Sequence, residues 1–327
     1  MLRRFLFAAI AAMLMASPAG AHSKRGKIAL TFDDLPALTI FKDQPYVNYL
    51  NLTILRGLRR HHLPATGFVN EGKLDDIDYE AQIKVLRMWL DAGMDLGNHT
   101  FSHESPNTLG AENYIADIAR GEPVTKRLLE QHHRQMRWFR HPYLETGTPL
   151  AVKRAIDLWL SAHHYRIAPV TVDGDDWEFA EPYDDAIARH DEARRLRIKS
   201  QYLAHTAKSI AWSQQAAHSL FGREISFVML LHATRLNADC INDLAAMLGR
   251  HHLRAVSLSE AMRDPAYLTP DPYVGSDGIQ WLERWSTELH RDLPWNSYED
   301  VPADIAADYD RVDNDAKKDA LPSAPSP

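Results

Sequence analysis

The chain of 327 residues contains a single cysteine, Cys240. One thiol cannot form a disulfide within the chain, and the N-terminal region has no cysteine for a lipid anchor. Most of the free energy of folding must therefore come from a hydrophobic core. With 45% hydrophobic and 25% charged residues, the composition is typical of an ordinary globular protein with one large domain and extensions.

Basic residues are fewer than acidic ones, with 37 Lys and Arg against 44 Asp and Glu, so the formal net charge is -7. Nucleic acids and anionic membrane surfaces bind proteins through a basic face. We therefore predict no nucleic-acid partner, and a neutral or cationic substrate fits the charge better. The sequence gives no indication of the oligomeric state.

The N-terminal apolar run is too short to span a membrane. It extends from Phe5 to Ala16, whereas a spanning helix needs roughly 20 residues. Two arginines precede it and small residues follow at 18–21, which is the pattern of a signal peptide. We predict a signal peptide over residues 1–21, export to the periplasm or the extracellular space, and no stable membrane anchor after cleavage. A retained anchor is the alternative.

Short β-rich runs alternate with longer helical patterns, as expected of βα units around a parallel sheet. The predicted strands are Lys27 to Phe32, Thr66 to Asn70, Met94 to Asn98, Trp138 to Arg140, Val170 to Asp173, Phe227 to Leu231 and Arg254 to Ser257. The predicted helices lie near 47–61, 80–92, 112–133, 148–163 and 238–251. About seven βα units favour an α/β barrel, although a doubly wound open sheet would gather its strand ends in a similar way.

Two segments depart from this alternation. Residues 183–221 predict one long or two shorter helices, which could form a lid or wall or simply pack on the core. Residues 265–312 are rich in proline and aromatic residues and predict an extension packed on the barrel. We assign residues 22–264 to a catalytic domain, and the charged and then Pro/Ser-rich residues 313–327 to a disordered tail.

Polar side chains follow the predicted strands at the points where these end. They are Asp33, Asp34, His99, Arg140, Asp173, Asp176 and His232. Because the ends of the strands of a βα barrel meet on one face, where active sites are built, we expect these residues to converge.

Each of these signals is ambiguous by itself. Asp33 and Asp34 could divide the roles of base and metal ligand, but Asp-Asp-Leu-Pro also suits a turn. His99 and His103 are four residues apart, which predicts two imidazoles on one helical face, able to share one divalent ion. With 17 histidines, such a spacing also arises by chance. Arg140 could hold a carboxylate or form a structural salt bridge.

Together, five ordered segments resemble the motifs of NodB-type polysaccharide deacetylases, which form carbohydrate esterase family 4. They are Thr31 to Asp34, His99 to His103, Arg140 to Tyr143, Asp173 to Trp177 and Leu230 to His232. The resemblance covers about residues 27–260, and its fourth motif is the loosest. It implies a distorted (β/α)7 barrel and a metal-dependent hydrolase that removes acetyl groups from a carbohydrate, above all one of N-acetylglucosamine type. The predicted export places that carbohydrate outside the cytoplasm.

The resemblance also implies roles for individual residues at the metal end of the site. Asp34, His99 and His103 would ligate one divalent ion, with Zn2+ favoured over Co2+ or a similar ion. Asp33 would accept a proton from the attacking water. Arg140 would orient Asp33, and the backbone N–H of Tyr143 would help to stabilise the oxyanion.

At the other end, His232 would protonate the leaving group with the support of Asp176, which we prefer to Asp173. Leu230 and Trp177 would line the pocket for the acetyl methyl. Leu35 stands where the family commonly has glycine, and its side chain could narrow the approach to the site.

Three other functions compete with N-deacetylation. An O-acetyl esterase on a xylan-type glycan would use the same site. A catalytically silent glycan-binding protein is disfavoured because the expected catalytic positions are all filled. A two-carboxylate glycosidase would have no use for the pair His99 and His103.

Overall fold

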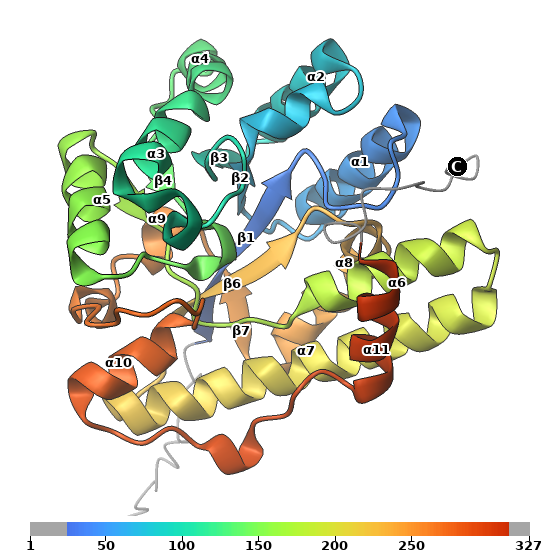
Figure 1. Ribbon diagram of the computed structural model, residues 1–327. Coiled ribbons are helices and arrows are strands. Elements are labelled where there is room, and N and C mark those ends of the chain that lie inside the picture. Colours follow the sequence, from blue (N-terminus) through green and yellow to red (C-terminus); the bar gives the residue numbers. More distant parts are fainter. Residues whose placement is uncertain (1–24, 314–327) are drawn as a thin grey trace, which may run out of the picture.

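The structure is a computed structural model that describes residues 25–313 (Figure 1). The predicted signal peptide and residues 314–327 of the predicted tail lie outside the described residues, so both stay predictions.

The described part of the chain folds as a curled parallel sheet surrounded by helices, which confirms the predicted α/β class and distorted barrel (Figure 1). The strands are β1 (Gly26–Leu35), β2 (Ala65–Val69), β3 (Asp95–Asn98), β4 (Trp138–Phe139), β5 (Arg166–Ile167), β6 (Ser226–His232) and β7 (Leu253–Ala255). Their order is β5-β4-β3-β2-β1-β6, and β7 pairs with the first residues of β1. This order brings the ends of β1, β3 and β6 to one face.

The predicted strand from Val170 to Asp173 was wrong. In the structure this stretch contributes an isolated parallel bridge between Val172 and Met229 of β6. The short strand β5 lies earlier in the chain, where Arg166–Ile167 pairs with β4. Residues 166–172 therefore pair with β4 at their start and with β6 at their end, so one segment closes the barrel. Because this segment divides its backbone hydrogen bonds between two neighbouring strands, neither pairing is long enough to form a long strand.

Helices connect the strands and cover the sheet. They are α1 (Gln44–Arg60), α2 (Tyr79–Asp91), α3 (Pro106–Arg120), α4 (Pro123–Gln131), α5 (Leu150–Ala162), α6 (Asp176–Ala188), α7 (Glu192–Phe221), α8 (Arg235–Arg250), α9 (Leu258–Ala261), α10 (Trp281–Leu289) and α11 (Ala303–Val312). Short 3-10 turns are η1 (Glu71–Asp75), η2 (Pro142–Leu144), η3 (Pro265–Leu268) and η4 (Trp295–Ser297). Among residues 25–313, none of these helices has both the length and the apolar character to cross a membrane.

Local sequence explains the central elements. The core strand β1 is buried on both faces, because Ile28 and Ala29, whose side chains point to opposite faces, are both fully covered, as a strand inside a parallel sheet requires. Helix α1 begins where the side chain of Asp43 accepts the N–H of Tyr46 at 2.7 Å. The aliphatic residues that follow at helical spacing face the core.

Two predicted helical segments are each divided. The pattern at 112–133 is split between α3 and α4 at Gly121, where a Cβ would lie 2.5 Å from the backbone of Thr100. Pro123 then starts α4, a position that proline tolerates. The segment 183–221 belongs to α6 and α7, the second of the two forms predicted. Asp191 caps α7, and its side chain accepts the N–H of Arg194 at 2.9 Å.

Residues 265–312 lie against the barrel through both backbone and side-chain contacts. The N–H of Trp281 donates to the carbonyl of Val170 at 2.8 Å. Arg284 is fully buried and donates to the carbonyl of Leu144 at 2.6 Å. Trp285 is 1% exposed and belongs to the main core. Most of this aromatic stretch therefore packs, while the exact domain boundaries stay predictions.

Candidate active site

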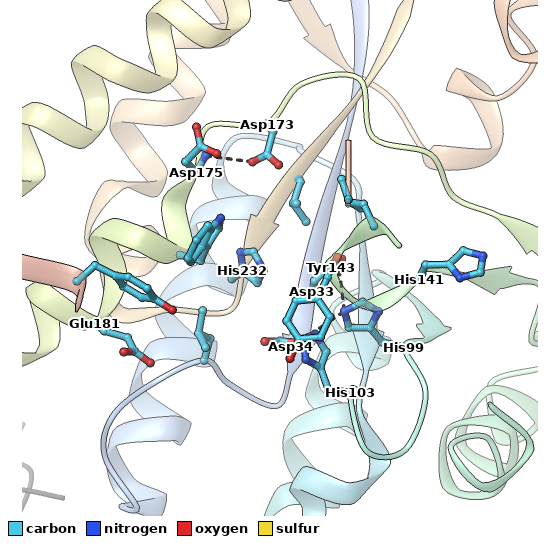
Figure 2. Close-up of a pocket in the computed structure, with 16 residues that line it drawn as sticks. Asp33, Asp34, His99, His103, His141, Tyr143, Asp173, Asp175, Glu181 and His232 are labelled. Carbon is cyan, nitrogen blue, oxygen red and sulfur yellow. Dashed lines mark hydrogen bonds and ion pairs between the residues drawn. The ribbon is translucent and has the colours of Figure 1, made fainter. Parts of the chain in front are cut away.

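The strand ends that carry the predicted site residues surround a cavity of 370 Å³ (Figure 2). The predicted residues that line it are Asp33, Asp34, His99, His103, Tyr143, Asp173, Trp177, Leu230 and His232. Arg140 and Asp176 lie behind this lining and contact Asp33 and His232. The structure thus brings all the predicted site residues together, although their roles stay predictions.

Asp33 lies at the end of β1 and is 2% exposed. Burial raises the pKa of its carboxyl group to about 6, even though the charge of Arg140 opposes this shift. A raised pKa makes a carboxylate a stronger proton acceptor, as a general base requires.

Arg140 follows β4 and is fully buried. Its guanidinium donates to both carboxylate oxygens of Asp33, at 3.0 and 3.3 Å, and to the hydroxyl of Thr31 at 3.0 Å. Its Nε donates to the carbonyl of Ala168 at 2.7 Å. The arginine therefore holds Asp33 in one orientation.

Asp34, His99 and His103 form a compact cluster in which one ligand atom from each residue lies within 4.8 Å of the others. Oδ1 of Asp34 lies 3.6 Å from Nε2 of His99 and 3.3 Å from Nε2 of His103. This oxygen is buried and has no hydrogen-bond partner among the described residues. A buried acceptor without a donor costs about 1–3 kcal/mol, which a cation at this point would offset.

The environment of His99 also suits a metal ligand. Its Nδ1 lies 2.8 Å from the carbonyl oxygen of Arg140. Because a carbonyl can only accept, Nδ1 carries the hydrogen and Nε2 presents its lone pair to Asp34. Burial lowers the pKa of His99 well below its usual value, which keeps the ring neutral. The three residues therefore fit one divalent ion and leave coordination positions open.

The predicted helix for the histidine pair was wrong. Residues 99–105 form a loop in which Thr100 and His103 have positive φ values of 66° and 61°. The N–H of His103 donates to the hydroxyl of Thr100 at 3.0 Å, and the N–H of Thr100 donates to the side chain of Asn98 at 2.7 Å. These side-chain hydrogen bonds replace helical ones, so both imidazoles still face Asp34 by another route.

Lys73, in η1, is a neighbour of the cluster that the motifs did not indicate. Its ammonium lies 3.2 Å from Oδ2 of Asp34. Burial favours the protonated form of Asp34, but His103 and Lys73 outweigh it and hold the pKa of Asp34 well below its usual range. Asp34 is therefore ionised, as a metal ligand must be.

His232 ends β6 and meets Asp176, the first residue of α6. Nδ1 of His232 lies 2.8 Å from one oxygen of Asp176, and the backbone N–H of His232 donates to the other oxygen at 2.7 Å. Burial alone would lower the pKa of His232, but Asp176 raises it to about 9. Asp173 lines the cavity without such a contact, and burial and Asp175 raise the pKa of its carboxyl group. The geometry favours Asp176 as the partner.

A pH profile can test this pairing. His232 must be protonated to act as an acid, so activity should fall as the pH rises through its pKa. Replacing Asp176 with Asn removes the neighbouring charge, and the alkaline limb of kcat against pH should move about 1–3 units lower. Asp173→Asn serves as the matched control and should leave that limb in place. A shift found only in Asp173→Asn would reverse the assignment.

The loop that carries Tyr143 has an uncommon backbone. Tyr143 and Leu144 both have positive φ values, 55° and 58°. A Cβ on Gly278 would lie 1.5 Å from the carbonyl oxygen of Tyr143, so only glycine fits beneath this loop. The ring of Tyr143 packs edge-on against His103, with centroids 4.6 Å apart. The motifs did not indicate Gly278, because it lies far from Tyr143 in the sequence.

Leu35 does not narrow the site. It is fully buried, and its side chain packs over Gly67 of β2, where an added Cβ would lie 2.6 Å from a methyl carbon of Leu35. It is not among the residues that line the cavity. The expectation of a constricted approach was therefore wrong.

The fold and this site define a hydrolase on a distorted βα barrel, and residues 20–158 match the family model described as polysaccharide deacetylase. The match covers fewer than half of the residues of the chain, and over them the chain is similar to the polysaccharide deacetylase family. The match confirms the resemblance inferred from the motifs. It includes Asp33, Asp34 and the histidine pair and ends before Asp176.

Solved structures with a similar fold include the polysaccharide deacetylase Bc1974 from Bacillus cereus. It is 15% identical, with a TM-score of 0.50 over 71% of this chain and 92% of that chain. The Bc1960 peptidoglycan N-acetylglucosamine deacetylase is 19% identical, with a TM-score of 0.50 over 77% of this chain and 91% of that chain. At these identities the likeness concerns the fold. A search of curated proteins finds no match.

Proposed function

We propose that this chain is a metal-dependent hydrolase that removes N-linked acetyl groups from an extracytoplasmic glycan of N-acetylglucosamine type. The observation that carries the proposal is one cavity in which a buried carboxylate, Asp33, and a histidine with a raised pKa, His232, lie beside the cluster of Asp34, His99 and His103. A base, an acid and a cation site are the parts that hydrolysis of an unactivated amide needs.

The residues of the chain divide the work of hydrolysis. Asp33 takes the proton of the attacking water, and Arg140 keeps its carboxylate turned toward the cavity. A divalent ion held by Asp34, His99 and His103, Zn2+ above all, would polarise the acetyl carbonyl and make water a stronger nucleophile at neutral pH. The backbone N–H of Tyr143 donates to the oxygen on which negative charge develops.

The leaving group distinguishes an amide from an ester. An amine must be protonated before it leaves, whereas an alkoxide leaves more readily. Asp176 raises the pKa of His232 to about 9, so the imidazole carries that proton at neutral pH. This observation favours N-deacetylation over the O-acetyl esterase alternative. Leu230 and Trp177 line the same cavity and would contact the acetyl methyl.

Acetate release tests the proposal. We would compare chitin oligomers, peptidoglycan fragments and acetylated xylan, using the wild type, His232→Ala and the control His218→Ala, which alters an exposed histidine of α7. We expect release from the N-acetylated glycans, strongly reduced in His232→Ala and unchanged in the control. If xylan alone releases acetate and His232→Ala retains much of that activity, the protein is an esterase.

Metal content gives a separate prediction. The wild type should bind about one divalent ion per chain, as a site with three protein ligands does. The double variant His99→Ala/His103→Ala should lose it, because Asp34 alone remains. Elemental analysis measures the content, with His61→Ala/His218→Ala as a control of two histidines outside the cavity. Full occupancy in the first double variant would contradict the ligand assignment.

A further inference from the structure

Helix α11 is fixed across α6 and α7 (Figure 1). Its Ile305 is 1% exposed and belongs to the main core. Arg194 of α7, itself 8% exposed, lies 2.9 Å from Asp308 of α11 and 2.6 Å from Asp185 of α6. Arg311 of α11 reaches the same Asp185 at 3.1 Å. The buried side chain of Ile305 and the ion pairs that Arg194 and Arg311 form with Asp185 therefore fix the position of α11.

Helix α11 adds a wall to the cavity. Tyr309 lines it and packs edge-on against Trp177 of α6, with ring centroids 5.0 Å apart. Glu181 is four residues after Trp177, on the same face of α6, and also lines the cavity. The side chain of Glu181 is nevertheless buried, because the residue is only 2% exposed. The cavity is therefore covered where α6 and α11 meet.

The two ends of the cavity differ in exposure. Figure 2 shows Glu181 on the opposite side of the cavity from His99 and His103, with His232 between them. Tyr143, on the histidine side, is 53% exposed. The cavity is therefore open to a long substrate on the side of Tyr143, whereas the side chains of Trp177, Glu181 and Tyr309 block it at the other end.

We infer that α11 makes this protein selective for the end of a glycan chain, so that the sugar that loses its acetyl group is terminal or the glycan is a short oligosaccharide. This inference rests on the proposed function. An interior sugar has a neighbour on each side, and the wall leaves room for a neighbour on the Tyr143 side alone. The ring of Tyr309 would contact the apolar face of the terminal sugar, and Glu181 would accept hydrogen bonds from its hydroxyls.

The test is the position of deacetylation along a fully N-acetylated chitin hexamer, read by mass spectrometric sequencing of partly converted product. We expect the wild type to deacetylate one end. Tyr309→Ala removes the ring and should raise interior deacetylation relative to terminal deacetylation about tenfold or more. Tyr309→Phe should keep the wild-type pattern. Trp295→Ala alters an exposed ring of the same C-terminal stretch outside the cavity and should also keep it.

The same samples separate this inference from the proposed function. If the wild type releases acetate from interior sugars as readily as from terminal ones, end selectivity is refuted while deacetylation stands. If Tyr309→Ala melts at the wild-type temperature and keeps the end pattern, the wall does not set the selectivity. If no hexamer sample releases acetate, the proposed function fails and this inference fails with it.

Discussion

Asp33→Asn should lower kcat for acetate release by about 100- to 10,000-fold, the usual contribution of a general base. An amide has nearly the same size as the carboxylate and can still accept from Arg140, so the local packing should persist. It cannot accept a proton from water. Asp33 is outside the cluster that we assign to the metal, so the ion content should stay at the wild-type level. Initial rates and elemental analysis of one preparation measure both quantities.

A matched control separates the chemistry from a general effect of charge. Asp75→Asn makes the same substitution at an exposed position of η1 and should leave kcat unchanged. Turnover of Asp33→Asn within a few fold of the wild type would remove Asp33 as the base. Loss of the ion together with the activity would instead place Asp33 among the ligands.

Arg140→Leu should lower the free energy of unfolding by about 3–5 kcal/mol, because it leaves the buried carboxylate of Asp33 without its counterion. Urea denaturation at neutral pH, with a chelator present so that metal binding does not contribute, measures this loss. The double variant Asp33→Asn/Arg140→Leu should recover part of it, because no unpaired charge remains. If the free energy of unfolding of Arg140→Leu falls by less than about 1 kcal/mol, the ion pair of Asp33 and Arg140 contributes little to stability.

The same variant has a defined pH dependence. The pKa of Asp33 is already raised to about 6 by burial, and removing the arginine raises it further. A carboxyl group whose pKa is higher in the folded than in the unfolded state destabilises the fold when it is ionised. This penalty begins above the unfolded-state pKa and is complete above the folded-state pKa. The difference in the free energy of unfolding between Arg140→Leu and the wild type should therefore narrow as the pH falls below the pKa of Asp33 in the variant, because Asp33 then takes up a proton. A constant difference would point to lost packing instead.

The strand-end residues were predictable because hydrophobic runs stop at them. Asp33 and His232 lie at the ends of buried strands and His99 directly follows one, and parallel strands bring such positions to one face. The ordered motifs then narrowed the chemistry. They could not choose between Asp173 and Asp176, because both lie within one short segment. Only the observed contact of Asp176 with His232 separates them geometrically.

Local structure was predicted less well where side chains replace backbone hydrogen bonds. The four-residue spacing of His99 and His103 suits a helix, but Thr100 and His103 adopt a left-handed conformation, which is unfavourable for residues other than glycine. Neighbouring side chains accept their N–H groups and stabilise that conformation. Sequence spacing carries no information about such neighbours.

Contacts across long sequence separations were missed for a different reason. Gly278 and Tyr309 reach the cavity from the C-terminal stretch, more than a hundred residues after Tyr143. The aromatic content of that stretch was visible in the sequence, but Trp281 and Trp285 are buried against the barrel. A helical pattern at 303–312 could have indicated α11, whereas its place beside Trp177 could not be read from one sequence.

Because Tyr309 lies near the end of the described residues, this wall of the cavity is completed late during synthesis of the chain. At 5–20 residues per second, roughly 4 to 18 s separate the synthesis of Phe221, the last residue of α7, from that of Tyr309. During that interval the faces of α6 and α7 that α11 later covers have no partner, and the apolar seat of Ile305 is exposed. A nascent chain therefore exposes this apolar surface until α11 has been made and has packed. A chain truncated before residue 303 would expose it permanently and would be a target for chaperones and proteases.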